Sequence, residues 1–336
     1  MHLKICTSRF AYYGLHLKVA LQKTKMTFFS RLKDSVKESV RPTTKTTLWL
    51  LKIMLPISLV VTVAQHYGLI DALAVYLDPV MRFAGLPGKA AVGFLTGAFV
   101  TTYAGIAAML QLSLTIREAT IVSIMMCLCH ALFVESAVNR RVGSSFWKMF
   151  VIRLSMAFLC AFYLNLVLPE DMSGRFGEGI TMEAEGDNWL WAWVVSSVKM
   201  SVMIYLLIFA LMIVQRMVEH YGLMEKLASP LRPLMRFCGL PENAAYMWIV
   251  GNILGISYGS AVMMDLEEQG KITRDEANDV NYHLIMNHSL LEDTTVFASM
   301  GVPALWIVST RFLFALIVVW GRKLFKKIAV SLGNMK

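Results

Sequence analysis

Charged residues are scarce in this sequence. Only 16% of its 336 residues are Asp, Glu, Lys or Arg, whereas about a quarter of the residues of an ordinary soluble domain are charged. Hydrophobic residues make up 57% of the chain, and the mean hydropathy is +0.57. This composition excludes a soluble, secreted, disordered or nucleic-acid-binding chain and is typical of a membrane protein.

Motifs that would indicate catalysis are scarce as well. The sequence has no HExxH zinc motif, no P-loop and no CxxC pair, so metalloprotease, nucleotide-driven and redox chemistry lack their minimal residue sets. The five cysteines are odd in number and lie mostly in apolar stretches, which argues against a disulfide framework. We therefore expect a protein that is not an enzyme and that carries no cofactor.

Long apolar stretches, in contrast, recur along the chain. A helix needs about 20 apolar residues to cross a hydrocarbon core about 30 Å thick. Four candidates in each half, named segments a, b, c and d, lie at 47–65, 88–112, 119–138 and 146–168, and again at 190–215, 243–266, 277–299 and 303–321. The predicted fold is accordingly an all-α polytopic membrane protein.

The two halves of the chain are copies of one another. The stretch HYGLIDALAVYLDPVMRFAGLPGKAA, which starts at His66, returns as HYGLMEKLASPLRPLMRFCGLPENAA at His220. At this offset, 21 of the 47 positions from residue 66 to residue 112 are identical. After a short insertion the register resumes, so that His130 corresponds to His288. The sequence thus predicts two structural repeats.

The charge distribution predicts that these repeats are inverted. Residues 1–45 contain ten Lys and Arg against two acids, and the chain ends near the basic stretch GRKLFKK, whereas the linker between the halves has a single arginine among several acids. Because basic segments favour the cytoplasmic side, both termini are expected inside and the linker outside, and each half then crosses the membrane an odd number of times. The expected organisation is a basic cytoplasmic tail (1–45), repeat 1 (46–168), an acidic external linker (169–189), repeat 2 (190–325) and a basic cytoplasmic C-terminus (326–336).

Four candidate spans in each half do not fit an odd number of crossings. Each repeat is therefore expected to make about three full crossings and to contain one re-entrant or broken helix. Segment c carries polar residues, and we favour it as the interrupted segment. Segment b carries glycines that suit either close helix packing or an unwound backbone that binds a solute: Gly93, Gly97 and Gly105, and in the copy Gly251, Gly255 and Gly259.

Segment c also contains the residues that could bind a solute or an ion. His130 and Glu135 lie in an apolar stretch of the first half, and His288 and Asp293 lie at the matching positions of the second. A charge at mid-bilayer costs about 2.5–3.5 kcal/mol, so these groups are expected to face a cavity or one another. Each histidine is separated from its acid by about 140° around a regular helix, and a break after the histidine would bring the two together. The alternatives are a solute or ion site and a polar pair that ties helices together.

Further candidates follow from position and spacing. Arg153 and Arg311 each lie 18 residues after the acid of their half, and they either pair with these carboxylates or extend to the membrane interface. The predicted binding site comprises His130, Glu135, Ser136, His288, Asp293, Thr294, Asn252, Ser257 and Tyr258. An alternative metal site would use Cys129, His130, Glu135, His288 and Asp293, and the second half supplies no cysteine to it.

The repeated motifs together resemble a known family. Two copies of a segment with GLPxxAA, a glycine-rich helix and the pattern H-x-L-x-x-[ED]-[ST] resemble, over residues 48–325, the Gate or nucleoside-recognition domain. That domain is shared by concentrative nucleoside transporters, the membrane part of the ferrous-iron transport protein B and the spore maturation proteins A and B. The chain has no G-domain sequence and is shorter than the nucleoside transporters. The resemblance implies two Gate repeats and, for a bacterial member, the inner membrane.

The leading interpretation is an inner-membrane permease for a small polar solute, with nucleoside-like compounds as candidates, driven by an ion gradient because no nucleotide motif is present. The alternatives are a transporter of divalent metal ions such as ferrous iron and a non-transporting membrane interaction protein of the spore-maturation type. The expected partners are the lipid bilayer and the solute or ion, with a second copy or a second Gate protein as further candidates and no nucleic acid. Met1 and Met26 are both open as the start of the protein.

Overall fold

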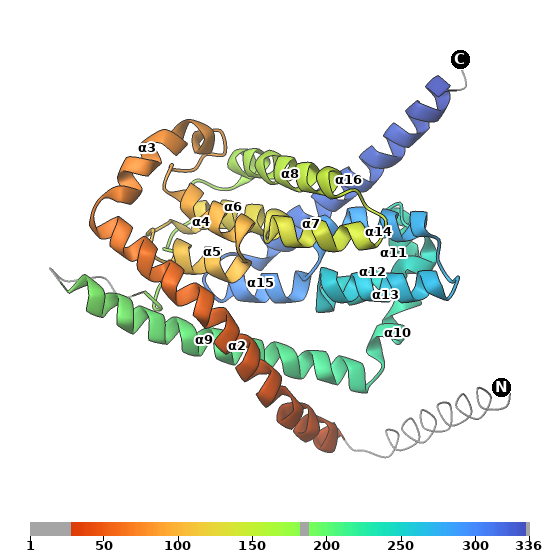
Figure 1. Ribbon diagram of the computed structural model, residues 1–336, viewed down its shortest axis with the longest axis horizontal. Coiled ribbons are helices and arrows are strands. Elements are labelled where there is room, and N and C mark those ends of the chain that lie inside the picture. The colour runs from red at the N-terminus through yellow and green to blue at the C-terminus, as the bar shows by residue number, and fades with distance from the viewer. Residues whose placement is uncertain (1–27, 182–187, 334–336) are drawn as a thin grey trace, which may run out of the picture.

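The computed structural model describes residues 28–181 and 188–333, and this part of the chain is almost entirely helical (Figure 1). Repeat 1 contains α2 (Phe28–His66), α3 (Leu69–Arg82), α4 (Ala90–Phe99), α5 (Thr102–Met109), α6 (Ile116–Cys129), α7 (Leu132–Arg141) and α8 (Phe146–Val167). Repeat 2 contains α9 (Trp189–His220), α10 (Leu223–Ala228), α11 (Arg232–Phe237), the short η1 (Glu242–Ala244), α12 (Ala245–Leu254), α13 (Ile256–Glu268), α14 (Arg274–Asn287), α15 (Leu290–Ala298) and α16 (Ala304–Gly333). No strand forms within the described ranges, so the predicted all-α class is confirmed.

Within residues 28–181 and 188–333, five helices are long and apolar enough to cross a membrane when α6 and α7 are taken together. They are α2, α6 with α7, and α8 in repeat 1, and α9 and α16 in repeat 2. The pair formed by α14 and α15 is the counterpart of α6 and α7 in the sequence repeat, and it lies beside α6, α8 and α16 in the bundle. The chain is therefore a multi-pass membrane protein, with three such elements in repeat 1, two in repeat 2 and the α14–α15 pair in the place of the third.

Contacts at the two ends of the bundle establish that counterparts run in opposite directions. α6 begins beside the linker, where the N–H of Ile116 donates to the carbonyl of Gly174. α15 instead ends beside the linker, where the N–H of Gly177 donates to the carbonyl of Met300. At the opposite end, Ser144 just before α8 donates to Asn278 near the start of α14. The end that holds residues 169–181 is called the linker end, and the other, where α2 begins and α16 finishes, the basic end.

Segment b of each half folds into a short helical hairpin rather than a spanning helix. α4 and α5 pack against each other so closely that a methyl group placed on Gly105 would lie 2.8 Å from the Cα of Gly97. α12 and α13 form the matching hairpin of repeat 2, in which a methyl group placed on Gly259 would lie 3.1 Å from the Cα of Gly251. In Figure 1 the first hairpin lies toward the left end of the molecule and the second toward the right, so the two enter from opposite ends.

The interruption of the helices therefore differs from the expectation. The polar residues favour segment c as the interrupted one, and it is indeed broken in both repeats, between α6 and α7 and between α14 and α15. Segment b, however, is the re-entrant one, and its glycines serve the close packing within each hairpin. Both segments are thus discontinuous. The two helices of segment b fold back on each other, whereas the two helices of segment c follow one another across the bundle.

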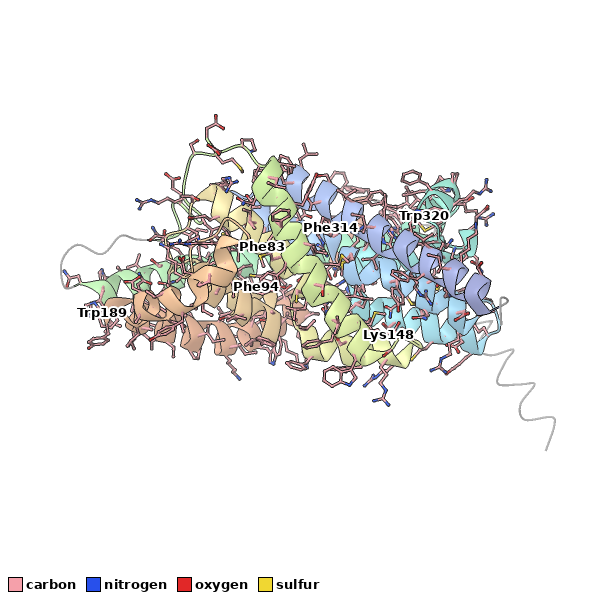
Figure 2. All side chains as sticks on the ribbon, turned by 90° about the horizontal axis from the view of Figure 1, so that it is seen from above. Phe83, Phe94, Lys148, Trp189, Phe314 and Trp320 are labelled. Atoms are coloured by element: carbon pink, nitrogen blue, oxygen red, sulfur yellow. The ribbon has the colours of Figure 1, made fainter. Side chains whose placement is uncertain are left out.

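The outer helices extend beyond the expected domain boundaries. α2 begins at Phe28, so the predicted tail boundary at residue 45 falls inside a continuous helix, while residues 1–27 lie outside the described part. α2 packs along α9, and the ring of His66 stacks on Trp189 at 4.7 Å between centroids at the linker end. Figure 2 places Trp189 near one end of the molecule and Trp320 near the other, as is usual for aromatic residues at the two membrane interfaces.

Because the first hairpin is packed more tightly, we expect a methyl group added to it to destabilise the protein more than one added to the second hairpin. Gly105→Ala should lower the free energy of unfolding by about 1–3 kcal/mol, because its methyl would lie 2.6 Å from Met126 and 2.8 Å from the Gly97 backbone. Gly259→Ala, at the matching position, requires a shift of only a few tenths of an ångström. Thermal unfolding in detergent should therefore give a lower midpoint for Gly105→Ala. Equal midpoints would contradict the difference in packing.

Candidate functional site

The break in each interrupted helix is stabilised by a hydrogen bond to the hairpin of its own repeat. Ala131 and Ser289, which follow the two histidines, adopt the left-handed conformation with φ of 42° and 51°. Residues other than glycine rarely adopt it and retain it where the surroundings enforce it. The N–H of Ala131 donates to the carbonyl of Gly97, and the N–H of Ser289 donates to the carbonyl of Gly251, both at 3.1 Å. The hairpin and the break therefore form one unit in each repeat.

A buried arginine satisfies the carbonyl groups that each break leaves without a helical partner. Such groups need a donor wherever water is excluded. Arg153 of α8 and Arg311 of α16 are both fully buried. The bonds run from Arg153 to the carbonyls of Leu128 at 3.0 Å and His130 at 2.8 Å, and from Arg311 to the carbonyls of Met286 at 3.0 Å and His288.

The same two arginines pair with the acids of segment c. Arg153 lies 2.6 Å from Oε2 of Glu135, and Arg311 lies 2.9 Å from Oδ2 of Asp293. The sequence leaves pairing and extension to the interface open, and the structure shows pairing. Each arginine thus stabilises both the backbone of a break and an ionised carboxylate.

Three side chains from the two repeats converge between the breaks. Oε1 of Glu135 lies 3.1 Å from Nε2 of His130 and 3.2 Å from Nε2 of His288. The two Nε2 atoms are 3.3 Å apart. We call His130, Glu135 and His288 the histidine cluster. His130 and Glu135 come from repeat 1 and His288 from repeat 2, so the site exists only where the repeats meet.

Asp293 does not join the histidine cluster, although it is the counterpart of Glu135. Its carboxylate is bonded to Arg311, and among the described residues no bond links it to either histidine of the cluster. An aspartate is one methylene shorter than a glutamate, so the carboxylate that pairs with its arginine cannot extend as far toward the interface between the repeats. The two repeats thus have matching backbones at this position, but their acidic side chains differ by one carbon atom.

A cavity of about 440 Å³ adjoins the histidine cluster. It is lined by hydroxyl groups of the first hairpin tip (Thr101, Thr102, Tyr103), by His130, Ser289, Glu292 and Asp293 at the breaks, and by Trp49 of α2, Gln215 of α9 and Tyr258 of α13. Polar groups and flat aromatic rings therefore face the same space. Its volume lies in the range usual for small-molecule sites.

The remaining predicted site residues are spread over several surroundings. Ser136 and Thr294, which occupy matching positions, are inward-facing, and their hydroxyls have no hydrogen-bond partner within the described part of the chain. Asn252 donates to the Trp248 carbonyl of its own helix at 2.8 Å, and Tyr258 lines the cavity. Ser257 is exposed on α13. Cys129, proposed for the metal alternative, is fully buried and is not among the converging ligand atoms.

Ser257 also lies within a sequence that matches the GxSxG pattern of hydrolases, GISYG at residues 255–259. In those enzymes the serine occupies a sharp turn between a strand and a helix and contacts a histidine. Here it lies in the first turn of α13, directly after α12, and no hydrogen bond to a histidine is formed among the described residues. The local structure therefore differs from the strand–turn–helix arrangement of those enzymes.

Glu292 is a cavity residue that sequence reasoning missed. Its carboxylate accepts a hydrogen bond from the hydroxyl of Tyr103 at 2.7 Å, which joins the tip of the first hairpin to α15 of the other repeat. The signal in the sequence is a second acid directly before Asp293. Because neighbouring residues on a helix face different directions, only the position of the break shows that both acids reach the same cavity.

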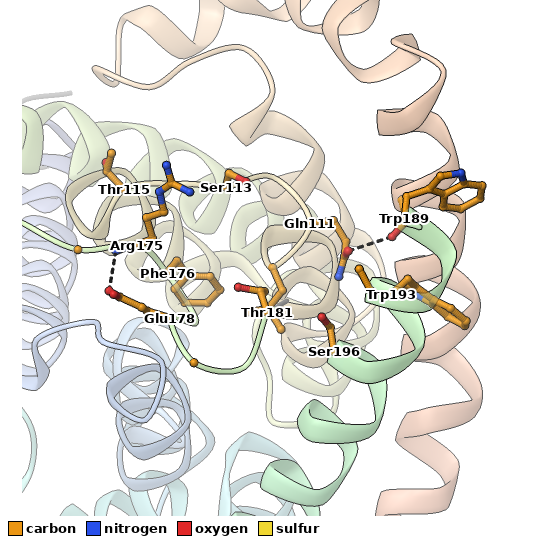
Figure 3. Close-up of a pocket in the computed structure, with 15 residues that line it drawn as sticks. Gln111, Ser113, Thr115, Arg175, Phe176, Glu178, Thr181, Trp189, Trp193 and Ser196 are labelled. Atoms are coloured by element: carbon orange, nitrogen blue, oxygen red, sulfur yellow. Dashed lines mark hydrogen bonds between the residues drawn. The ribbon is translucent and has the colours of Figure 1, made fainter. Parts of the chain in front are cut away.

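A larger cavity, of about 1000 Å³, lies at the linker end and away from the histidine cluster (Figure 3). Gln111, Ser113 and Thr115 line it, together with Arg175 and Glu178 of the linker. α5, whose residues are all buried, separates this cavity from the cluster. We therefore place the candidate site at the histidine cluster and refer to the larger cavity as the linker-end cavity.

The fold and the site define a multi-pass membrane protein with paired re-entrant hairpins. Residues 47–143 match the family model described as Gate, nucleoside recognition, and repeat 2 is the internal copy of this part of the sequence. The chain is similar to the protein named Uncharacterized membrane protein YvoD of Bacillus subtilis (strain 168), at 29% identity over 294 residues, covering 85% of this chain and 94% of the relative. No solved structure matches the chain.

Proposed function

We propose that this protein is a permease of the bacterial inner membrane that moves a small polar solute, of nucleoside-like chemistry, through the cavity beside the histidine cluster. The observation that carries the proposal is the meeting of two opposed hairpins and two broken helices at one cavity lined by residues of both repeats. Discontinuous helices at the interface of inverted repeats are the usual setting of a transporter's binding site.

The lining of the cavity supports a solute with both a ring and hydroxyl groups. Trp49 and Tyr258 provide aromatic faces on which a heterocyclic base can stack, and Glu292, Gln215 and Thr101 provide donors and acceptors for a sugar. The family description of the first repeat, nucleoside recognition, agrees with this chemistry. A gradient of an ion is the proposed driving force, since the sequence has no P-loop.

A second, smaller cavity supports a route toward the basic end. It has a volume of about 220 Å³ and shares Leu254 and Tyr258 with the first, so the two adjoin. Its lining continues to Glu219 at the end of α9 and Glu225 in α10, which lie at the basic end. On the linker side, the buried α5 separates the site from the linker-end cavity. This arrangement corresponds to one of the two states that alternating access requires.

The proposed orientation places the basic end in the cytoplasm. Arg140, Arg141 and Lys148 lie at this end in repeat 1, and Lys323 and Lys326 lie there in repeat 2, as the preference of basic residues for the cytoplasmic side requires. A periplasm-active phosphatase inserted after Gly179 in the linker should therefore be active, whereas the same reporter fused after Lys336 should be inactive. Comparable activity at both positions would overturn the inverted topology.

Uptake by reconstituted vesicles tests the proposed function directly. Vesicles that contain the purified protein should accumulate a labelled nucleoside above the level of protein-free vesicles. The same nucleoside should stabilise the purified protein by about 2.7 kcal/mol at a hundredfold excess over Kd, because it binds only the folded state. A panel of nucleosides that is neither taken up nor stabilising would instead favour a non-transporting membrane interaction protein.

A further inference from the structure

We propose that the histidine cluster is a binding site for one divalent transition-metal ion, with two imidazole nitrogens and one carboxylate oxygen as ligands. The inference concerns binding by the cluster and does not depend on the proposed transport of a nucleoside. It reduces the five-residue metal alternative from the sequence to three ligands, because Asp293 is held by Arg311 and the Cys129 thiol does not converge with the others.

The hydrogen bonds of the two imidazoles leave three electron pairs facing one point. Nδ1 of His130 lies 3.0 Å from the carbonyl of Met126, and Nδ1 of His288 lies 2.7 Å from the carbonyl of Leu284. A carbonyl only accepts, so each Nδ1 carries the hydrogen and each neutral ring presents a lone pair at Nε2. These lone pairs face each other and Oε1 of Glu135, and three acceptors can share one centre only around a cation.

The spacing of the three atoms suits a metal ion. Their separations are 3.1, 3.2 and 3.3 Å. In a tetrahedral site with metal–ligand distances of about 2.0–2.1 Å, neighbouring ligand atoms lie about 3.3 Å apart. One ion above the centre of this face, a little outside the plane of the three atoms, would therefore reach all three at ordinary bond lengths, and the side chains would not have to move.

The second layer of contacts has the form that metal-binding histidines usually show. Each ligating ring is normally oriented by a hydrogen bond from its other nitrogen to a carbonyl or a carboxylate, and both rings have this bond here. Arg153 holds Oε2 of Glu135, which orients the carboxylate and leaves Oε1 toward the histidines. The ligands are thus preorganised by the backbone of the two breaks.

The ligand set also indicates which ions would bind. Imidazole ligands favour zinc, cobalt, nickel and iron, whereas magnesium and calcium prefer oxygen ligands. Three protein ligands leave a fourth position of a tetrahedral ion open. His130 lines the 440 Å³ cavity, so this position would be available to water or to a donor atom of a solute in the cavity.

The experiment uses the full chain, purified without a histidine tag, treated with a chelator and titrated with Co²⁺. We expect one Co²⁺ per chain with the visible absorption of a four-coordinate ion, displaced by Zn²⁺ and unaffected by Mg²⁺. The variants His130→Gln and His288→Gln should each weaken binding by about 100-fold or more, since loss of contacts to the ligands alone costs 10–100-fold. The variant His66→Gln, at an exposed histidine outside the cluster, should bind as the wild type does.

The wild-type titration keeps the proposal testable even where a variant fails to fold. Absence of stoichiometric Co²⁺ binding by the folded wild-type protein would overturn the metal site and leave a shared proton as the cation between the lone pairs. Unchanged binding in both cluster variants would overturn it as well. Nucleoside uptake measured on the same preparation separates the two proposals: metal binding without uptake contradicts only the proposed function, and uptake without metal binding contradicts only the metal site.

Discussion

Replacing Arg311 with methionine is expected to destabilise the protein by about 3–5 kcal/mol, the usual consequence of leaving a buried charge without its partner. Asp293 is 5% exposed and its ion pair with Arg311 is 2.9 Å long. The same substitution removes the donors to the carbonyls of Met286 and His288 at the break. Methionine fills a similar volume, so the effect would reflect lost charge pairing and lost hydrogen bonds rather than a cavity.

A double variant separates these two contributions. Adding Asp293→Asn to Arg311→Met removes the unpaired charge but leaves both carbonyls without a donor, so the thermal midpoint should recover only in part. Arg236→Met provides a matched control, because the ion pair of Arg236 with Glu242 is exposed and such pairs contribute little. Strictly additive effects of the two substitutions would show that Arg311 and Asp293 are not coupled.

Loss of either histidine of the cluster is expected to abolish uptake while the protein remains folded. His130 and His288 belong to different repeats, yet their Nε2 atoms are 3.3 Å apart and share one carboxylate oxygen. Substitution of either by glutamine disrupts the same site, so uptake by vesicles should fall to the level of protein-free vesicles in both cases. Elution as a single peak in size-exclusion chromatography would establish that the variants are folded.

His283 and His66 lie outside the histidine cluster, and their variants serve as controls for the effect of losing a histidine on uptake. His283 is buried five residues before His288, where its ring accepts a hydrogen bond from Trp248, and His66 is exposed at the linker end. His66→Gln should retain uptake, and His283→Gln should affect stability before transport. If both cluster variants retained full uptake, the histidines would have a structural role, and the solute would have to bind elsewhere in the cavity.

The class of fold and its repeat architecture are evident from the amino-acid sequence. Identical positions such as His66 with His220 and Pro87 with Pro241 establish the two copies without any knowledge of their contacts. An odd number of crossings follows from the basic ends and the acidic linker, and the contacts of α6 and α15 at the linker end agree with it. The hydrophobicity of a segment favours its insertion into the membrane and its charge favours one side, so both the spans and their orientation can be predicted from composition along the chain.

The fold-back of segment b could not be predicted because its residues have two uses. Gly97 and Gly105 are spaced as they would be on the packing ridge of a straight helix, and they are also the residues that allow two short helices to approach. Whether segment b forms a straight helix or a hairpin depends on the carbonyl of Gly97, which accepts a hydrogen bond from the N–H of Ala131 in segment c. Nothing in the local pattern of either segment indicates this contact.

Composition and internal repetition alone were enough to establish the membrane class, the two repeats and the set of polar residues that must avoid lipid. Those properties follow from the cost of each side chain in a bilayer, which is independent of its neighbours. Which of these residues meet depends instead on the packing of the two repeats. Glu135 contacts both histidines and Asp293 does not. The extra methylene of glutamate has this effect only because the tertiary structure fixes the positions of both arginines and both breaks. Glu292 enters the cavity for the same reason, through its contact with Tyr103 across the interface of the repeats.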